Sequence, residues 1–384
     1  MKVERVSIRH VRVPLKRPFR TAQTERTASD NVIAQVTLEC GATGFGEGAP
    51  REYVTGETPE TCFEFARAEA PKLIGRMATS FAEAAHIASG IGFGPDPLKP
   101  QCAARCALET ALLDAAGRHF AVSLSSLVNA IPEFASISRR NEDVRYGVVL
   151  SAEAGAMKAW LYHLYGFRDF KVKVAGGNVA ADVARVARIR RALGRKPDLR
   201  VDVNGAWSPR DAVKGLAALA ALDVSLVEQP VGRDQMLEFA QIRPKDGPAV
   251  LLDESLVGER DAQLALDAGL GDAFNLRLSK NGGMIPLMRL AKFALDHRLG
   301  IMLGCHPGET GILSAAGRAV ACSVRNLLHI EGSYDRHLIA KNVIDEDITF
   351  GAGGRARRLS GPGLGVTVRL DYLDALTVAK ADVE

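Results

Sequence analysis

The spacing of apolar residues changes several times along the chain and divides it into segments. Residues 3–13 alternate loosely between apolar and polar positions, and residues 31–39 form a β-branched run that ends in glycines. Both patterns are typical of β-strands and predict an antiparallel unit near the N-terminus. Residues 15–30 and 50–58 are polar without periodicity, so we predict a loop in each place.

Helical spacing follows from Pro59 to Asn129 and is clearest in residues 101–120, where alanines and leucines recur every three or four positions. The last residues, 349–384, are rich in glycine and contain a short β-like run at 365–370. We expect this final segment to rejoin the N-terminal unit.

Between these regions, short apolar runs of strand length alternate with helical segments. Each run except the last is followed by a plausible helix, and such alternation predicts right-handed βαβ units around a parallel sheet. A closed α/β barrel and an open doubly wound sheet both give this pattern, but eight strands over about 185 residues favour the barrel. The predicted strands are Tyr146–Leu150, Asp169–Val174, Asp198–Val203, Ser225–Glu228, Ala249–Asp253, Ala273–Ser279, Gly300–Gly304 and Asn326–Ile330.

Composition narrows the class of protein. The chain has 384 residues, of which 47% are hydrophobic and 24% charged, as in ordinary globular proteins. A net charge of +4 is too small to imply nucleic acid or a membrane surface as a partner. We find no signal peptide or membrane-spanning run and expect a cytoplasmic protein with no membrane partner. Its six cysteines are too sparse for a disulfide framework, so we expect reduced thiols.

Ionisable residues recur near the ends of five successive predicted strands. Lys173, Asp202, Glu228, Asp253 and Lys280 follow one another at intervals of 25 to 29 residues, which is the period of the strand–helix unit. Each acid alone has an ordinary interpretation as a turn residue, a solvated strand end or a helix cap. Independent caps have no reason to keep this period. In barrels the carboxyl ends of the strands form the active-site face.

Three carboxylates on adjacent strands would repel one another unless a cation neutralised them. Asp202, Glu228 and Asp253 therefore predict a metal site. Since its ligands are oxygens only, Mg²⁺ is favoured over zinc, and Mn²⁺ is a possible substitute.

Three lysines complete the predicted site. Lys171 and Lys173 are two residues apart on one strand and so point to the same face, where repulsion and a nearby metal would lower a lysine pKa. Lys280 follows the sixth strand, across the barrel from the second. A base on each side of a metal is what two-sided proton transfer requires. The alternative for each lysine is a solvated side chain on an edge strand or loop.

Together these residues resemble the enolase superfamily and, within it, the muconate lactonizing enzyme subgroup. The resemblance covers essentially the whole chain. It rests on Gly44-Phe45-Gly46-Glu47-Gly48, Tyr53-Val54-Thr55-Gly56-Glu57-Thr58, Lys171-Val172-Lys173, Asp202-Val203-Asn204, Glu228-Gln229-Pro230, Asp253-Glu254-Ser255 and Lys280-Asn281-Gly282-Gly283.

The resemblance implies an α/β fold, a modified TIM barrel of the (β/α)₇β kind with an α+β capping domain. The capping domain would comprise residues 1–135 and 346–384, and the barrel residues 136–345. The resemblance also implies that the three carboxylates hold Mg²⁺, that Lys173 and Lys280 are the acid/base pair, and that Lys171 tunes Lys173. A homo-oligomer is expected on the same ground.

The chemistry implied is removal of the proton next to a substrate carboxylate, with the enediolate charge stabilised by the metal. Return of a proton to the other face gives a racemase or epimerase of an amino-acid derivative or dipeptide, which we favour. Cycloisomerisation and dehydration, of the succinylbenzoate-synthase or acid-sugar type, are the alternatives, and a non-catalytic carboxylate binder is the rival class.

Substrate choice is expected to depend on the two N-terminal loops and the ends of the last strands. Dipeptide epimerases of the subgroup carry an Asp-x-Asp motif after the eighth strand, but here that stretch has only Glu331 in place. Arginines of the first loop, Arg20 among them, are candidates to recognise a distal anionic or polar group. The candidate substrate-binding residues are Arg20, Tyr53, Asn204, His306, Glu309 and Glu331.

Overall fold

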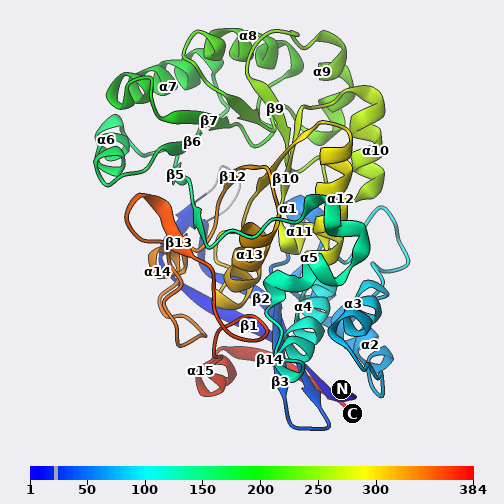
Figure 1. Cartoon of the computed structure of the whole chain (residues 1–384). Helices are drawn as coiled ribbons and strands as arrows, with labels where there is room; N and C mark the ends of the chain where they lie inside the picture. The colour runs from blue at the N-terminus through cyan, green and yellow to red at the C-terminus, as the bar shows by residue number, and fades with distance from the viewer. Residues whose placement is uncertain (21–24) are drawn as a thin grey trace.

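The computed structural model describes the backbone of residues 1–20 and 25–384, and the side chains of residues 1–18 and 27–384. Figure 1 shows a barrel in the upper half of the molecule and a mixed sheet-and-helix unit below it. Eight parallel strands pair in the order β12-β11-β10-β9-β8-β7-β6-β5. The amide of Gly147, just before β5, donates a 2.8 Å hydrogen bond to the carbonyl of Ile330 at the end of β12, which joins the first strand to the last.

The predicted (β/α)₇β barrel is confirmed. Each predicted strand is present, and each but the last is followed by a helix that packs outside the sheet. The strands are β5 (Val148–Leu150), β6 (Asp169–Lys173), β7 (Asp198–Asp202), β8 (Leu226–Glu228), β9 (Ala249–Leu252), β10 (Ala273–Leu276), β11 (Gly300–Leu303) and β12 (Leu327–Ile330). The helices are α6 (Ala156–Leu164), α7 (Val179–Leu193), α8 (Pro209–Ala220), α9 (Met236–Ile242), α10 (Glu259–Ala268), α12 (Met284–Asp296) and α13 (Gly311–Ser323).

The sixth strand is shorter than predicted. It ends at Leu276, and Leu278–Asn281 forms a one-turn helix, α11, instead of continuing the strand. The turn is held by the side chain of Asn281, whose Oδ1 accepts a 2.7 Å hydrogen bond from the amide of Arg277. Lys280 therefore projects from this turn rather than from the strand itself.

The lower unit contains an antiparallel sheet in the order β14-β1-β2-β3. Its strands are β1 (Val3–Arg20), β2 (Glu25–Leu38), β3 (Thr43–Gly48) and β14 (Thr377–Val383). The loop predicted at 15–30 is wrong in its described part, because β1 and β2 extend into it as paired arms of one hairpin. The strand predicted at 365–370 is also wrong. The returning strand is β14, and Leu370–Ala375 forms helix α15.

The predicted helical stretch between the sheet and the barrel is confirmed as α2 (Pro59–Glu69), α3 (Phe81–Ser89) and α4 (Cys102–His119). The loop predicted at 50–58 contains a short helix, α1 (Glu52–Thr55). The domain boundaries at residues 135/136 and 345/346 stay a prediction. Across the described residues, no helix combines the length and the apolar character needed to span a membrane. All six cysteines are free thiols.

Alternate glycines on β3 let this strand lie directly on helix α4. A Cβ at Gly44, Gly46 or Gly48 would approach backbone atoms of α4 to 2.0–2.1 Å. Any larger residue at these three positions would have to separate strand and helix. The Gly-x-Gly-x-Gly pattern is therefore a packing requirement.

Two buried glutamates connect the lower unit to the barrel. Glu47 of β3 accepts hydrogen bonds from the amides of Thr310 (2.9 Å) and Leu313 (3.0 Å), at the start of α13. Glu109 of α4 accepts from the amide of Met284, the first residue of α12, at 2.5 Å. A carboxylate at a helix N-terminus satisfies amides that have no partner within the helix and complements the helix dipole. Each glutamate thus docks one barrel helix onto the lower unit.

Replacing Glu47 tests this docking. Glu47→Gln is expected to lower the free energy of unfolding by about 2–4 kcal/mol, because an amide cannot accept all four of the hydrogen bonds that reach the carboxylate. The measurement is urea unfolding followed by circular dichroism. Glu39→Gln is the control, since Glu39 is exposed and pairs with the surface residue Lys2, so the loss should be within about 1 kcal/mol. Equal effects in the two variants would contradict the docking role.

Candidate active site

Three carboxylates meet at the carboxyl ends of adjacent barrel strands. Asp202 ends β7, Glu228 ends β8 and Asp253 directly follows β9, and all three are fully buried. The strands deliver them in register, because Asp202 pairs with Glu228 in the β7–β8 ladder. The structure therefore brings together the three residues that the sequence predicts as metal ligands.

The two lysines of β6 face this cluster. Lys171 Nζ lies 3.1 Å from Glu228 Oε2 and 3.7 Å from Asp202 Oδ2. Lys173 Nζ lies 2.9 Å from the same Asp202 oxygen. Lys171 is buried, whereas 31% of the Lys173 side chain is exposed. Lys173 is thus the β6 lysine that solvent reaches.

Lys280 meets the cluster from the other side of the barrel. Its ammonium donates to Asp253 Oδ1 (2.9 Å), to the carbonyl of Asp253 (2.8 Å) and to the carbonyl of Asn275 (2.6 Å). Three acceptors match the three protons of an ammonium group. β6 and β10, which carry Lys173 and lead to Lys280, are four strands apart in a ring of eight, so the two lysines enter from opposite sides.

Sequence reasoning missed two charged members of the cluster. Arg277 hydrogen-bonds Asp253 Oδ2 and lies 3.4 Å from Glu228 Oε1, so it pairs with two of the three carboxylates. Glu254 is next to Asp253 and accepts a 3.3 Å hydrogen bond from Asn204. The signal for Arg277 was its position, three residues before Lys280 and directly after the strand.

The pKa values follow from burial and ion pairing. Burial raises the pKa of Glu228 to about 8, with Asp202 adding repulsion. At Asp253 burial acts in the same direction, but Arg277 and Lys280 outweigh it and lower the pKa. For Lys280, burial exceeds the attraction of Asp253 and lowers the pKa.

The lowered lysine pKa predicted from the sequence assumes a metal ion beside the two β6 lysines, whereas the carboxylates by themselves act in the opposite direction. For Lys173, burial and the nearby Lys171 do lower the pKa, but the ion pair with Asp202 outweighs them and the net shift is upward. The pKa of Lys171 is also raised, because Glu228, Glu331 and Asp202 together exceed the effect of burial. Attraction to carboxylates is therefore stronger here than the mutual repulsion of the lysines.

The residues of the cluster fit a hard divalent cation. The donors offered by Asp202, Glu228 and Asp253 are carboxylate oxygens, which Mg²⁺ prefers. A buried oxygen of the neighbouring Glu254, Oε2, has no hydrogen-bond partner. Burial, with Asp253 and Asp202 nearby, raises the pKa of Glu254 to about 7. An unpartnered carboxylate oxygen beside these three carboxylates adds one more oxygen donor of the kind that a hard cation takes.

The predicted substrate-binding residues are spread around the mouth. Asn204 accepts a 3.0 Å hydrogen bond from Lys173, and Tyr53 on α1 is 48% exposed and lines a cavity beside the mouth. Glu309 is buried, which raises its pKa to about 8, and its Oε2 accepts from the amide of His306. Burial, with Arg277 and Arg51 nearby, lowers the pKa of His306, so its ring is neutral. The side chain of Arg20 lies outside the described residues.

Glu331 is turned into the barrel rather than toward the mouth. Its two oxygens lie 2.7 Å from Lys171 Nζ and 3.1 Å from Arg200 Nη1. Its role as a substrate-binding residue stays a prediction, and both of its carboxylate oxygens are paired with cations inside the barrel. Glu331 thus balances two buried cations beneath the predicted metal ligands.

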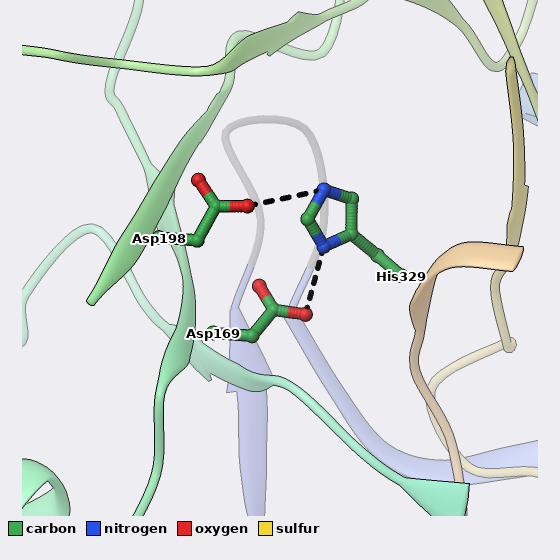
Figure 2. Close-up of side chains that lie close together, drawn as sticks. All are labelled: Asp169, Asp198 and His329. Atoms are coloured by element: carbon green, nitrogen blue, oxygen red, sulfur yellow. Dashed lines mark hydrogen bonds and ion pairs between the residues drawn. The ribbon is translucent and has the colours of Figure 1, made fainter. Parts of the chain in front are cut away.

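Arg200 continues this network to the opposite end of the barrel. Its Nε lies 3.0 Å from Asp169, which in turn lies 3.0 Å from His329 Nδ1. The other ring nitrogen of His329 lies 3.4 Å from Asp198, so the imidazole bridges two carboxylates (Figure 2). The ligand atoms of these three side chains are close enough together to hold a metal ion. Arg200 already supplies positive charge to Asp169. The bridge formed by the imidazole ring therefore suits this cluster without a metal ion.

Comparison with known proteins identifies the family of the chain. The family model for the mandelate racemase/muconate lactonizing enzyme N-terminal domain matches residues 3–129, and the model for the enolase C-terminal domain-like family matches residues 154–372. The chain therefore belongs to the mandelate racemase/muconate lactonizing enzyme family of the enolase superfamily, as the sequence predicted. Members of this family bind Mg²⁺.

One relative and two solved structures show what the chain is similar to. A hydrophobic dipeptide epimerase of Enterococcus faecalis is 30% identical over 85% of this chain and 89% of its own. The crystal structure of an N-succinyl Arg/Lys racemase from Bacillus cereus has a TM-score of 0.86 at 26% identity and full coverage of both chains. A dipeptide epimerase from Enterococcus faecalis, complexed with Mg and the dipeptide L-Leu-L-Tyr, has a TM-score of 0.81 at 26% identity, covering 96% of this chain and all of its own.

Removing the inward-facing carboxylate tests the charge balance. Glu331→Gln is expected to lower the free energy of unfolding by about 3–5 kcal/mol, since it leaves the buried Lys171 and Arg200 each short of a counter-charge. Chemical denaturation measures this loss. The control is Glu142→Gln, which breaks an exposed pair with Arg140 and should change stability by less than about 1 kcal/mol. A loss below about 1 kcal/mol at Glu331 would show that the network carries little of the stability.

Proposed function

We propose that this chain is a Mg²⁺-dependent racemase or epimerase that removes the α-proton of a carboxylate substrate, an amino-acid derivative or a dipeptide. The observation that carries the proposal is the pair of lysines on opposite sides of one carboxylate cluster. Lys173 is 2.9 Å from Asp202, and Lys280 is 2.9 Å from Asp253. Cytoplasmic location and a homo-oligomeric state stay predictions from the sequence.

Asp202, Glu228 and Asp253 are the residues that would hold the metal. When bound, Mg²⁺ stabilises the negative charge that develops on the substrate carboxylate as the α-proton leaves. Arg277 pairs with two of these carboxylates and adds a fixed positive charge beside them.

The two lysines would carry the proton. Lys173 must first lose the proton that its ion pair with Asp202 favours, which a cation held by Asp202 would promote. It then accepts the α-proton at Nζ on one face of the substrate, and Lys280, protonated, donates from its Nζ to the other face. Burial makes Lys280 the readier donor because it lowers the pKa of that ammonium. For the opposite enantiomer the roles reverse, so each lysine serves one face.

What happens after the α-proton has left distinguishes racemisation from the alternative reactions. Racemisation needs a proton donor on the face opposite the base, and Lys280 supplies one. Cycloisomerisation and dehydration need a reactive group in the substrate beyond the α-carbon. A protein that only binds carboxylates, without catalysis, would need neither lysine. Both lysines nevertheless lie against the carboxylate cluster.

Single lysine variants test the two-base mechanism. Lys173→Ala and Lys280→Ala are each expected to lower racemisation by about 10²–10⁴-fold, the usual contribution of a positioned acid or base. In D₂O each variant should still exchange the α-hydrogen of one enantiomer, and the two variants should exchange opposite enantiomers. Mass spectrometry and chiral chromatography read both outcomes on a panel of dipeptides and N-acylated amino acids.

The matched control is Lys292→Ala, which removes an exposed lysine of α12 that pairs with Asp296. Its racemisation and exchange rates should equal those of the unmodified chain. If Lys173→Ala racemised any substrate at the unmodified rate, the two-base mechanism would be refuted.

Metal titration distinguishes the two acidic clusters. Asp202→Asn and Glu228→Gln are expected to weaken Mg²⁺ binding by more than about tenfold, because each removes a ligand. Asp198→Asn, which alters the cluster at the far end of the barrel, should leave binding unchanged. Isothermal titration calorimetry measures all three. Loss of binding in Asp198→Asn alone would place the metal at the wrong end of the barrel for this function.

A further inference from the structure

A second group of carboxyl side chains lies around the start of α13, apart from the predicted metal ligands. Glu309 precedes this helix, Asp335 begins the short helix α14 (Asp335–Leu338), and Glu47 reaches in from β3. Burial raises the pKa of Glu47 to about 7 and that of Glu309 to about 8, and repulsion from Asp335 adds to both shifts. Carboxyl groups so close together and so poorly hydrated favour protonation of at least one of them.

The hydroxyl group of Ser314 lies between two of these carboxyl groups. Its Oγ is 3.1 Å from Glu309 Oε1 and 2.7 Å from Asp335 Oδ1. A hydroxyl group has one proton to donate, and an ionised carboxylate can only accept. If both carboxyl groups were ionised, one of these contacts would join two oxygens with no proton between them. One of the two carboxyl groups therefore carries a proton and donates it to Ser314.

Asp335 is better suited to be the anion of this pair. Burial raises its pKa, but the hydrogen bond from Asn342 (2.9 Å) and the positive charge of Arg318 act against that shift. Aspartate is also intrinsically more acidic than glutamate. The other oxygen of Glu309 accepts a single hydrogen bond, from the amide of His306 at 3.0 Å. The proton therefore belongs to Glu309.

The other titratable groups around Glu309 leave this assignment unchanged. Glu47 accepts four hydrogen bonds, an arrangement that suits its ionised form. Burial raises the pKa of both Cys305 and Tyr146, so both are neutral. Glu331 lines the same small cavity as Glu309, and both of its oxygens are paired with buried cations.

A protonated Glu309 completes a directed chain of hydrogen bonds. Its carboxyl group donates to Ser314, and Ser314 donates to Asp335. The second oxygen of Asp335 accepts from the side chain of Asn342, whose own oxygen accepts a 2.9 Å hydrogen bond from the amide of Gly311. The chain thus returns to the first residue of α13, and every donor in it has an acceptor.

Glu309 also holds the residue that faces the carboxylate cluster. Its side chain accepts from the amide of His306, and its own amide donates to the carbonyl of His306 at 3.2 Å. His306 is 2% exposed. Burial lowers the pKa of its ring, and Arg277 and Asp253 also shift that pKa, which places the imidazole beside the predicted metal site.

We propose that Glu309 is a positioning residue, which remains protonated in the folded protein at neutral pH and holds His306 at the site through the chain to Ser314 and Asp335. Ionisation of Glu309 leaves two carboxylates in competition for one hydroxyl proton, so one of the two contacts is lost. The inference does not rest on the proposed racemase function, because it concerns the folded chain without substrate.

The variant Glu309→Gln tests the protonation state. Its amide cannot ionise, but it can donate to Ser314 and accept from His306 as the protonated carboxyl group does. The pKa of Glu309 in the folded chain, about 8, lies above the ordinary value of 4.5, so the unmodified chain loses stability as the pH rises between these two values. Relative to Glu309→Gln, its urea midpoint should fall by about 0.5 M or more between pH 5 and pH 9.

A constant difference between these two midpoints over the same range would show that Glu309 is ionised in the folded chain, and would overturn the proposal. The control is Glu142→Gln. Glu142 is exposed, and its hydrogen bond and ion pair with Arg140 lower its pKa, so it is ionised in the folded and the unfolded chain above pH 5. Its midpoint difference should not change with pH.

Infrared spectroscopy detects the proton directly. The spectrum of the unmodified chain minus that of Glu309→Gln should contain the carbonyl stretch of a protonated carboxyl group at pH 7, and this band should disappear above about pH 8. Glutamates common to both proteins cancel in the difference. In Asp335→Asn the hydroxyl proton of Ser314 is free for Glu309, so the band should titrate at least about one pH unit lower. Absence of the band at pH 7, or an unchanged titration in Asp335→Asn, would contradict the shared proton.

The positioning role is read from nitrogen-15 resonances of the imidazole of His306. They should move as the pH of the unmodified chain passes through about 8, and they should not move in Glu309→Gln. At pH 7 they should be unchanged in Glu309→Gln and displaced in Glu309→Ala, which cannot bond Ser314. The exposed His297 should behave alike in all three proteins. If the infrared band titrates while the resonances of His306 stay fixed, Glu309 has no positioning role.

Discussion

The balance of buried charge at the carboxyl ends of the barrel strands is the constraint on which the rest of the structure depends. Asp202, Glu228 and Asp253 are removed from water, and an isolated carboxylate in such a place would be very costly. Lys171, Lys173, Arg277 and Lys280 surround them at ion-pair distances. The same arrangement places a lysine on each side of the cluster, so the groups that balance the charge are also those suited to move a proton.

The barrel and the lower unit are tied together near this cluster. Glu47 bonds the amides that begin α13, directly after the loop that carries His306 and Glu309. The side chain of Asn31, on β2, donates a 2.9 Å hydrogen bond to the carbonyl of Gly308 in the same loop. The loop at one side of the site is thus fixed by the antiparallel sheet, and the hairpin of that sheet lines the adjoining cavity.

Much of the barrel and of the carboxylate–lysine cluster could be predicted from the sequence, because the interval between the ionisable residues and their residue types were sufficient. The interval of 25 to 29 residues between Lys173, Asp202, Glu228, Asp253 and Lys280 places all five at one end of the barrel, and the structure has them there. The direction in which each side chain points, and the residues with which it pairs, could not be derived from the spacing. Glu331 follows β12 as an acid would in a substrate site, yet its partners Lys171 and Arg200 lie inside the barrel. Arg277 was overlooked because a strand was expected to continue through it.

Crystals of the protein grown with Mn²⁺ in place of Mg²⁺ would test the central claim most directly, since anomalous scattering locates the ion without assumption. We predict an anomalous peak coordinated by oxygens of Asp202, Glu228 and Asp253, with Arg277 moved away from Asp253 and with Lys173 and Lys280 on opposite sides of the ion. A peak between Asp169, Asp198 and His329, with none at the three carboxylates, would contradict the account.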